Sequence, residues 1–426
     1  MIRIAVLASG SGTNLQALLD ADLLPGEVVL VASDKPDAQA LGRSRMKGIP
    51  SIGLDRKTLG RKAFEQTLED LLGEHAVDLI VLAGFLTILS APFVNAHRNR
   101  IINIHPSLLP SFGGKGYYGE RVHEAVLKRG VKISGATVHL VTEEADEGPI
   151  LAQQALSVAD DDTPTSLGQR ILKTIEWTLL PKTVQQYCRK LEEEMQLETY
   201  LKGLRYPGRG ILCGLSEEGK ALLIYFITAR SKHSRNRMLV AQNEMVRTQA
   251  IDESLLVDPS LIIYRAIDRI GNAFVVANGD QSDAILASLA CGHSFEEGLA
   301  AATYEPDAPN YTPRISALFQ TGGPISYTLS ILRRREDGSC EHAFFPSAKL
   351  QAGEGHLIHT YEKEEEPLSS FAGEPRKMLL KGSGETLAQG VWQSLDERVR
   401  VGLCVKEIDL DTHEVQTIII NAEERR

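Results

Sequence analysis

Short apolar runs alternate with helical patterns through the first 190 residues of this 426-residue chain. The apolar runs are Ile2–Leu7, Val28–Ala32, Leu79–Ala83 and Ile101–His105, with helical patterns such as Leu15–Ala21 and Lys62–Leu72 between them. This rhythm is typical of βαβ units and predicts an open, mostly parallel α/β sheet with helices on both faces. Thr163-Pro164 supplies a cap and a first-turn proline for a last helix, which we expect to run from about 165 to 195.

The pattern changes near residue 200, so we predict domains over 1–190 and 206–426, joined by a charged helix end and linker at 191–205. The second part carries helical stretches at Asp283–Ala290 and Phe295–Ala301, and we expect an α+β domain with antiparallel sheet. Its strand-like runs are Ala221–Thr228, Leu261–Arg265, Ala273–Ala277, Tyr327–Leu332, His356–Tyr361, Val399–Val405 and Val415–Ile420.

The composition excludes several classes of protein. Residues 1–200 carry 21 basic and 25 acidic side chains, and residues 201–426 carry 25 and 31, so neither half has the basic surface of a nucleic-acid binder. We find no apolar run of the roughly 20 residues that span a bilayer, and the N-terminus reads as a strand rather than a signal peptide. Five scattered cysteines are typical of a reducing cytoplasm. We expect a cytoplasmic protein whose partners are small molecules, with a homo-oligomer left open.

The strand Ile101–His105, ended by Pro106, carries the strongest chemical signal of the first half. Asn103 and His105 are two residues apart, so their side chains point to the same side at the carboxyl end of the strand, where open α/β sheets bind ligands. An amide N–H can stabilise an oxyanion and a histidine can move a proton near neutral pH, and acyl transfer to an amine needs both. A satisfied structural pair is the competing interpretation. Asp146, in a later loop, would supply a proton acceptor beside the imidazole.

The segment Ser9-Gly10-Ser11-Gly12-Thr13-Asn14 joins the first strand to the first helix. Its glycines allow a tight turn, and a helix N-terminus offers free N–H groups and partial positive charge, which suits a phosphate. The spacing lacks the Gly-x-Gly-x-x-Gly fingerprint, and this disfavours a nicotinamide cofactor. A tight turn without a ligand is the alternative.

These motifs, together with Leu82–Leu86, the run 103–110, Gly135–His139 and Asp146-x-Gly-Pro, resemble phosphoribosylglycinamide formyltransferase in the same order. The resemblance covers residues 1 to about 190. It implies a Rossmann-like formyltransferase sheet and transfer of a formyl group from 10-formyltetrahydrofolate to glycinamide ribonucleotide, the third step of purine synthesis. Asn103, His105 and Asp146 match the catalytic trio: the first two would stabilise the oxyanion, and Asp146 would tune His105 and assist proton transfer to the leaving N10 through water.

By the same resemblance, residues beside the trio hold the two substrates. Gly12, Thr13 and Asn14 match the ribonucleotide phosphate loop, and Glu176 matches an acidic residue that helps to hold the glycinamide substrate. The folate side is matched by Phe85, Leu86 and Leu89, an apolar pterin wall, with Asn103.

The chain departs from the better-known form of this family at two places. A longer glycine-rich loop, Ser111–Gly119, replaces a short Pro-Gly-Leu-His segment, and Thr87 stands where many members carry arginine. Both changes bear on the substrate and folate contacts rather than on the trio.

Two relatives share the Asn-x-His-Pro core. Methionyl-tRNA formyltransferase would need a basic C-terminal RNA-binding domain, whereas this C-terminal half is acidic. Formyltetrahydrofolate deformylase usually carries an N-terminal regulatory domain, whereas the first predicted strand begins at Ile2. We therefore expect a small ribonucleotide as the acceptor.

Three segments of the second half carry polar groups suited to a phosphorylated ligand. Residues 229–237 concentrate five potential cations, and arginine forks recognise phosphate well, although a solvated basic turn is the alternative. Residues 278–283 are consistent either with a ligand contact or with a purely structural turn and helix cap. The proline-rich loop 305–315 would fix its polar side chains at little entropic cost.

These segments, with Gly208–Gly210, Ser260–Tyr264 and Gly353–Tyr361, resemble the IMP cyclohydrolase family first described in archaea, over about residues 200–426. The resemblance implies a four-layer αββα sandwich like that of the N-terminal-nucleophile hydrolases, without self-cleavage. It also implies closure of the purine ring, in which the carboxamide nitrogen of the formamido-imidazole ribotide attacks its own formyl carbon and water leaves. Proximity supplies much of the rate of such an intramolecular step.

The cyclohydrolase candidates are Arg230, Arg235, Arg237, Tyr264, Asn278, Glu305 and Arg314. We expect no metal, since His356 and His359 lack convincing partner ligands. The leading hypothesis is a bifunctional purine-synthesis enzyme. In the alternatives, the second half acts on another ribotide, by formamide synthesis for example, or is a nucleotide-sensing module.

Overall fold

The computed structural model describes residues 1–256, 259, 262–347, 350–363 and 365–422. The chain divides into two compact units, Met1–Glu193 and Glu194–Arg426. In the part of the chain that is described, no helix combines the length and the apolar character needed to cross a membrane.

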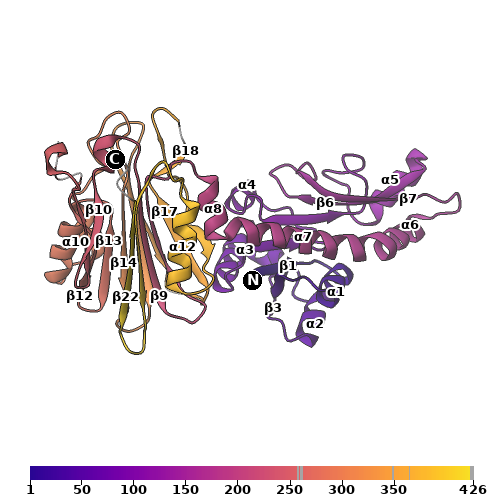
Figure 1. Cartoon of the computed structure of the whole chain (residues 1–426). Helices are drawn as coiled ribbons and strands as arrows, with labels where there is room; N and C mark the ends of the chain where they lie inside the picture. Colours follow the sequence, from indigo (N-terminus) through magenta and orange to yellow (C-terminus); the bar gives the residue numbers. More distant parts are fainter. Residues whose placement is uncertain (257–258, 260–261, 348–349, 364, 423–426) are drawn as a thin grey trace. The chain divides into compact units, whose positions relative to one another are not determined.

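The first unit alternates strands and helices (Figure 1). In chain order its elements are β1 (Ile2–Leu7), α1 (Thr13–Asp20), β2 (Gly26–Ser33), α2 (Gln39–Met46), β3 (Ser51–Gly53), α3 (Arg56–Glu74), β4 (Leu79–Leu82), α4 (Ala91–Ala96), β5 (Ile101–His105), α5 (Glu120–Arg129), β6 (Ile133–Leu140), β7 (Ile150–Ser157), α6 (Pro164–Ile171), the π-helical turn η1 (Leu172–Glu176) and α7 (Trp177–Met195).

One mixed sheet of seven strands, in the order β3-β2-β1-β4-β5-β6-β7, forms the centre of this unit. The pairings from β3 to β5 are parallel, and those of β6 with β5 and β7 are antiparallel. The α/β sheet predicted from the sequence is therefore confirmed, with an antiparallel edge. The apolar runs of β1, β4 and β5 are nearly continuous because the sheet is buried on both faces.

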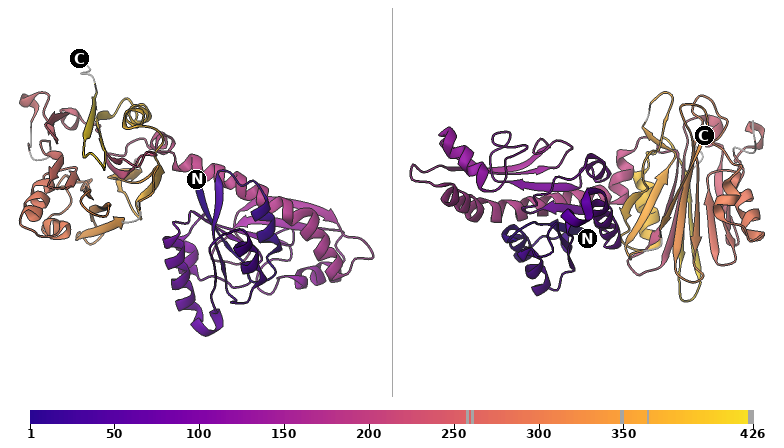
Figure 2. Two further views of the ribbon diagram at one scale, coloured as in Figure 1. Left: turned by 90° about the horizontal axis from the view of Figure 1, so that it is seen from below. Right: turned by 180° about the vertical axis from the view of Figure 1, so that it is seen from behind.

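Helices cover both faces of this sheet, as the two views in Figure 2 also show. On one face α3 and α4 pack Phe64, Leu68 and Phe93 against the strands. On the other face α7 brings Cys188 so close to Gly26 of β2 that a Cβ there would lie 2.7 Å from its Sγ.

The predicted last helix has the expected start but not a uniform interior. Thr163 caps it in a reciprocal pair with Ser166, and Pro164 lies in its first turn, as its sequence indicated. The helix continues to Met195, but η1 interrupts it as a π-helical turn that ends at Glu176. π-Helical turns of this kind occur often at functional sites.

The second unit consists mainly of antiparallel strands. Its elements are α8 (Leu197–Gly203), β8 (Arg209–Leu215), β9 (Ala221–Thr228), α9 (Lys232–Arg235), β10 (Met238–Gln242), β11 (Met245–Gln249), η2 (Glu253–Leu255), β12 (Arg265–Ile270), β13 (Ala273–Ala277), α10 (Gln281–Ala290), α11 (Phe295–Leu299), β14 (Arg314–Gln320), β15 (Ser326–Arg334), β16 (Cys340–Ser347), β17 (Glu354–His359), β18 (Tyr361–Lys363), β19 (Ser369–Ser370), β20 (Arg376–Leu379), α12 (Gly384–Ser394), β21 (Arg400–Ile408) and β22 (Val415–Asn421).

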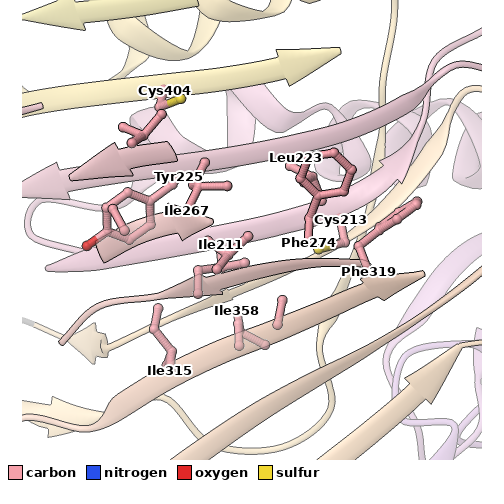
Figure 3. Packing of buried hydrophobic residues seen from close by; sticks show 14 of the residues in the cluster. Ile211, Cys213, Leu223, Tyr225, Ile267, Phe274, Ile315, Phe319, Ile358 and Cys404 are labelled. Atoms are coloured by element: carbon pink, nitrogen blue, oxygen red, sulfur yellow. The ribbon is translucent and has the colours of Figure 1, made fainter. Parts of the chain in front are cut away.

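Two large sheets pack face to face in this unit. Their orders are β10-β11-β12-β13-β14-β15-β16 and β20-β17-β8-β9-β21-β22. Ile211 and Tyr225 of one sheet and Phe274 and Phe319 of the other meet in the core between them (Figure 3). Helices α10 and α11 pack on the outer face of the sheet that contains β10 to β16. Helices α8 and α12 pack on the outer face of the sheet that contains β8 and β9 (Figure 1).

Two expectations for this region differ from the structure. The strand predicted at Leu261–Arg265 begins only at Arg265; Ser260 and Leu261 lie outside the described residues. The segment expected as a charged helix end and linker contains α8, whose Leu197 and Leu201 are buried in the core of the second unit. Leucines four apart on one helix face account for that packing.

Candidate functional sites

The carboxyl ends of β1, β4 and β5 meet at one edge of the first sheet, because Leu7 pairs with Leu82 and Leu82 with Asn103. A cavity of ≈ 670 Å³ lies at this edge. It is lined by the loop after each of these strands, by the glycine-rich loop that contains Lys115, and by the end of η1. This is the position at which open α/β sheets bind their ligands.

The predicted trio of Asn103, His105 and Asp146 lines this cavity. The Nδ1 atom of His105 lies 3.4 Å from Oδ2 of Asp146, and its Nε2–H donates to the carbonyl oxygen of Phe112 at 2.8 Å. Asp146 has a left-handed backbone, with φ of 61°, and the N–H of Gly114 donates to its Oδ2 at 2.9 Å. The structure therefore brings the three side chains together as the sequence predicted. The expectation that the longer glycine-rich loop would not bear on the trio was wrong, because that loop contacts both His105 and Asp146.

Asn103 is oriented by a histidine on the neighbouring strand. The antiparallel register places Asn103 opposite His139, and the Asn103 Nδ2–H donates to His139 Nε2 at 3.1 Å. His139 Nδ1–H in turn donates to the carbonyl oxygen of Leu140 at 2.9 Å, which leaves Nε2 as the acceptor. One amide N–H of Asn103 is thereby fixed, and the other remains available for a ligand.

Burial and charge act in opposite directions on the trio. Burial lowers the pKa of His105, while the Asp146 carboxylate and the Phe112 carbonyl oppose this shift. Burial acts to raise the pKa of Asp146, but the neighbouring His105 and the N–H of Gly114 lower it. The site therefore holds a carboxylate beside an imidazole whose neutral form is favoured by burial.

The predicted phosphate loop and Glu176 form one part of the cavity wall. The Asn14 Nδ2–H donates to Glu176 Oε2 at 2.7 Å, while the Oδ1 of Asn14 is buried without a partner among the described residues. Burial raises the pKa of Glu176, and the hydrogen bond from Asn14 opposes this. Gly12 caps α1 with φ of 70°, and Thr13 lines a separate hollow with Trp177. Asn14 and Glu176 therefore face the main cavity, and Thr13 does not.

The predicted apolar wall adjoins that loop, because the Leu86 N–H donates to Ser9 Oγ at 2.8 Å. Phe85 and Leu86 line the cavity, as predicted, but Leu89 is buried in the core against α3 and α4 and Ile88 lines the cavity in its place. Thr87, at the position where many members of the resembled family carry arginine, donates its hydroxyl to Asp34 Oδ2 at 2.7 Å.

Sequence reasoning missed several polar groups of this first site. They are Ser9, Gly114, His123 and His139. The histidine in Gly135–His139 could have been found from strand register, because it pairs with Asn103. His123 lies on α5, and its Nδ1 is buried without a partner among the described residues; nothing in its local sequence pattern separates it from a core histidine.

A second cavity of ≈ 290 Å³ lies in the second unit, at one end of the sandwich. The start of β8, the end of β9 and the loop that precedes β14 meet there. Of the predicted residues, Arg230, Arg237 and Glu305 line this cavity. Arg209 also lines it and was missed as a candidate, although the motif Gly208–Gly210 points to it.

Buried opposite charges dominate this second site. Arg209 Nη2 lies 3.9 Å from Glu305 Oε2, and both side chains are almost fully buried. Burial raises the pKa of Glu305, and Arg209 and Arg237 oppose this. Burial and the neighbouring Arg209 lower the pKa of Arg237. More positive than negative charge is held here, which suits an anionic ligand.

Aromatic rings form part of the second cavity wall. Tyr206 stacks on Tyr361 with 5.6 Å between ring centroids, and the guanidinium of Arg230 lies 4.6 Å from the centre of the Tyr206 ring. The Tyr361 hydroxyl hydrogen-bonds to Thr312 Oγ1. Flat rings beside cations suit a heteroaromatic base that carries a phosphate.

The other four predicted residues do not line this cavity. Tyr264 is buried between the sheets with its hydroxyl 2.7 Å from that of Tyr225. Asn278 follows β13 and hydrogen-bonds to the backbone of Pro313 and Ile315, which agrees with the structural alternative for this segment. Arg314 binds Asp280 and Gln281, and Arg235 donates to the carbonyl of Arg398.

Family models match both halves of the chain. Residues 2–184 match the model described as formyl transferase, and residues 206–412 match the model described as IMP cyclohydrolase-like protein. The solved glycinamide ribonucleotide transformylase 1 of Symbiobacterium toebii is 43% identical to this chain, covers 45% of it and 89% of its own length, and has a TM-score of 0.42.

The curated relatives that match the first half include one from Gallus gallus and one from Bacillus subtilis. The trifunctional purine biosynthetic protein adenosine-3 of Gallus gallus is 43% identical over 188 residues, which is 43% of this chain but only 18% of the relative. The chain thus spans less than a fifth of the length of the trifunctional relatives. The phosphoribosylglycinamide formyltransferase of Bacillus subtilis is 38% identical over 190 residues, which is 44% of this chain and 94% of that protein. Because it covers nearly all of that protein at this identity, the chain belongs through its first half to the phosphoribosylglycinamide formyltransferase family.

Proposed function

We propose that the first unit transfers a formyl group from 10-formyltetrahydrofolate to the amine of glycinamide ribonucleotide. The observation that carries this proposal is the convergence of Asn103, His105 and Asp146 on one cavity at the carboxyl edge of the sheet. The trio supplies an N–H donor, an imidazole and a carboxylate, which are the groups that acyl transfer to an amine uses.

In the proposed reaction the glycinamide amine attacks the formyl carbon of the folate. The developing oxyanion is stabilised by the second amide N–H of Asn103 and by protonated His105. Collapse of the tetrahedral intermediate breaks the bond from carbon to N10. The proton lost by the amine passes, through Asp146 and water, to the leaving N10, so the reaction needs neither a net acid nor a net base.

Two parts of the cavity wall suit the two substrates. The buried carboxylate of Glu176 and the unpartnered Oδ1 of Asn14 offer acceptors for the ribonucleotide beside the N-terminus of α1. Phe85, Leu86 and Ile88 offer an apolar wall for the pterin ring.

Formation of formylglycinamide ribonucleotide and tetrahydrofolate by the purified chain tests this function. We expect turnover that depends on both substrates and is lost in His105→Ala. Arg230→Ala, a change in the other unit, serves as the control and should leave formyl transfer unchanged. A wild-type chain that bound both substrates but transferred no formyl group would contradict the proposal.

We further propose that the second unit is an IMP cyclohydrolase with the αββα sandwich of the N-terminal-nucleophile-hydrolase type. The support is a cavity that combines Arg209, Arg230 and Arg237 with the buried acid Glu305. The arginines would hold the phosphate of the formamido-imidazole ribotide and orient its formyl oxygen. The carboxamide nitrogen would then attack the formyl carbon, with Glu305 moving protons as water leaves.

Turnover of the formamido-imidazole ribotide to IMP by the full chain tests this second activity. His105→Ala provides a background without formyl transfer, so any IMP formed comes from the second unit. Tight binding of the ribotide without turnover would favour a nucleotide-sensing module. If the second unit turns over a different ribotide but not this one, it is an enzyme with another substrate.

We propose domain limits at 1–190 and 206–426 for these two activities. Both act on small phosphoribosyl compounds, and neither mechanism uses a metal, a nucleic acid or a membrane.

A further inference from the structure

The backbone of Phe112–Gly114 contacts both titrating members of the trio. The Phe112 carbonyl accepts the Nε2–H of His105 at 2.8 Å, and the Gly114 N–H donates to Oδ2 of Asp146 at 2.9 Å. These two contacts lie two residues apart on one loop, which is part of the glycine-rich segment that distinguishes this chain. A displacement of that loop would therefore change both contacts together.

The first contact decides which ring nitrogen of neutral His105 carries the hydrogen. A neutral imidazole carries one N–H. Its tautomer is set by whether the groups that face each ring nitrogen donate or accept a hydrogen bond. Both the Phe112 carbonyl and the Asp146 carboxylate can only accept, but the carbonyl is the nearer, at 2.8 Å against 3.4 Å, so Nε2 carries the hydrogen of the neutral ring. The Nδ1 atom then faces Asp146 at 3.4 Å and is the atom that takes up the second proton when the ring becomes charged.

The second contact holds the carboxylate in position. Asp146 has a left-handed backbone and its side chain is 15% exposed, so its place depends on the groups around it. The N–H of Gly114 fixes Oδ2, the same oxygen that faces His105. A hydrogen bond to a carboxylate also favours its charged form.

Gly113 allows the loop to approach this closely. A Cβ at this position would lie 2.4 Å from Cδ2 of Leu109 and 3.2 Å from Cβ of Asp146. Leu109 is buried, so it has little room to move away. A side chain at residue 113 would therefore push the loop away from both members of the pair.

We propose that Phe112–Gly114 is a positioning element that fixes the tautomer of His105 and the carboxylate of Asp146 through backbone groups, and that Gly113 is the positioning residue that permits it. The inference rests on the proposed formyl transfer. It differs from the simpler view that this loop only covers the cavity, because a cover would change substrate binding rather than the state of His105.

The wild-type protein provides the first test. Nitrogen-15 NMR of histidine-labelled full chain distinguishes the two neutral tautomers, and the His105→Asn variant identifies the His105 signal among the 11 histidines of the chain. We expect the Nε2–H form. A His105 that is mainly in the Nδ1–H form would overturn the inference whatever the activity.

The Gly113→Ala variant provides the second test, with Gly42→Ala as the matched control. Gly42 of α2 also lacks a positive φ, and a Cβ there would meet nothing within 4 Å. For Gly113→Ala we expect kcat to fall on the order of 10- to 100-fold, as a misplacement near 1 Å produces, with KM for both substrates changed less than about 3-fold. The His105 signal should shift toward mixed tautomers, and the alkaline limb of the pH profile of kcat should move to lower pH.

The outcomes separate this inference from the proposed function. A folded Gly113→Ala protein with wild-type kcat and an unchanged His105 tautomer would overturn it, as would an effect confined to KM. If the variant does not fold, the wild-type NMR measurement still decides. If the wild-type chain transfers no formyl group, the proposed function fails, whereas the tautomer prediction can still be measured.

Discussion

Single residues in the first site owe their chemistry to the neighbours that fix them. Asn103 uses one amide N–H on His139, and that histidine is held in turn by the carbonyl of Leu140. The second amide N–H is thereby aimed at a fixed point instead of rotating. A preorganised donor of this kind costs no reorganisation when negative charge develops on the substrate.

Replacement of Asn103 by aspartate tests this donor. Asn103→Asp keeps the shape of the side chain but replaces the N–H donor with an acceptor, so we expect kcat to fall on the order of 100- to 1000-fold. Substrate binding should change little, since the contact strengthens mainly in the transition state. The exposed turn residue Asn243 of the second unit offers the matched control, Asn243→Asp, which should keep wild-type rates. A loss confined to KM would contradict the assigned role.

Glu176 combines a proposed role in substrate binding with a cost in stability. Burial raises its pKa above the ordinary value of 4.5, so above that pH the unfolded chain releases this proton more readily than the folded chain. Stability attributable to Glu176 is therefore present at low pH and is lost as the pH rises through the folded pKa. We expect Glu176→Gln to raise the Tm of the first unit at pH 8 by a few degrees and to have little effect below about pH 4.5.

The same variant should bind the ribonucleotide more weakly, because the carboxylate is lost from the cavity wall. Thermal unfolding across pH and the KM for glycinamide ribonucleotide measure the two effects. A lower Tm at pH 8 would show that the charge is better compensated in the folded protein than its burial implies.

At the scale of elements, local sequence pattern predicted much of the fold. The bounds of β1, β5, β9 and β13 match the apolar runs, because a strand buried on its faces leaves a continuous apolar signal. The short strands β10 and β11 carry little of this signal and were missed, and the predicted strand 261–265 was wrong about where the pairing starts. Pairing depends on partners distant in sequence, which a local pattern does not contain.

The candidate sites show the same difference between what a local pattern predicts and what contacts distant in sequence decide. In the first unit, strand alternation and the sheet edge were enough to bring Asn103 and His105 together. In the second unit, Asn278 and Arg314 were chosen for residue type, yet both hold the turn before α10 in place. A polar side chain in a loop can face a ligand or its own backbone, and composition alone cannot decide which.

The entry into α1 provides a test at this scale. Gly12 has φ of 70°, and a Cβ there would lie 2.8 Å from Ala40 of α2. Gly48 has nearly the same φ, 71°, with nothing within 4 Å of a Cβ. Gly48→Ala should therefore cost only the backbone strain, about 1 kcal/mol, whereas Gly12→Ala should cost more and displace the start of α1.

We expect Gly12→Ala to raise KM for the ribonucleotide at least about 10-fold while KM for the folate stays within about 2-fold, since we propose that the helix N-terminus binds the phosphate. Urea unfolding and steady-state kinetics on both variants measure these effects. Equal behaviour of the two variants would show that the close approach to α2 does not hold the loop.

At the scale of the whole molecule, each unit has its own core and its own cavity. The first cavity is lined by residues 9–176 and the second by residues 206–368, so no residue serves both. The chemistry proposed for the two cavities also differs, because one joins two substrates and the other closes a ring within one. Two sites built from separate residues should respond separately to mutation.

Reciprocal variants in the full chain test this independence. His105→Ala should reduce formyl transfer to background and leave the rate of IMP formation within about 2-fold of wild type. The reason is that His105 shares no contacting residue with the second site, and mutations without shared partners act independently. Arg230→Ala should affect only the second site. It removes an exposed cation that stacks on Tyr206 at the second cavity, so KM for the ribotide should rise while formyl transfer stays unchanged. Both rates are measured on the same preparations, with Asn243→Asp as a neutral reference. Loss of both activities in either variant, in protein that still melts cooperatively, would mean that the two units depend on one another, since the residues of each site cannot account for it alone.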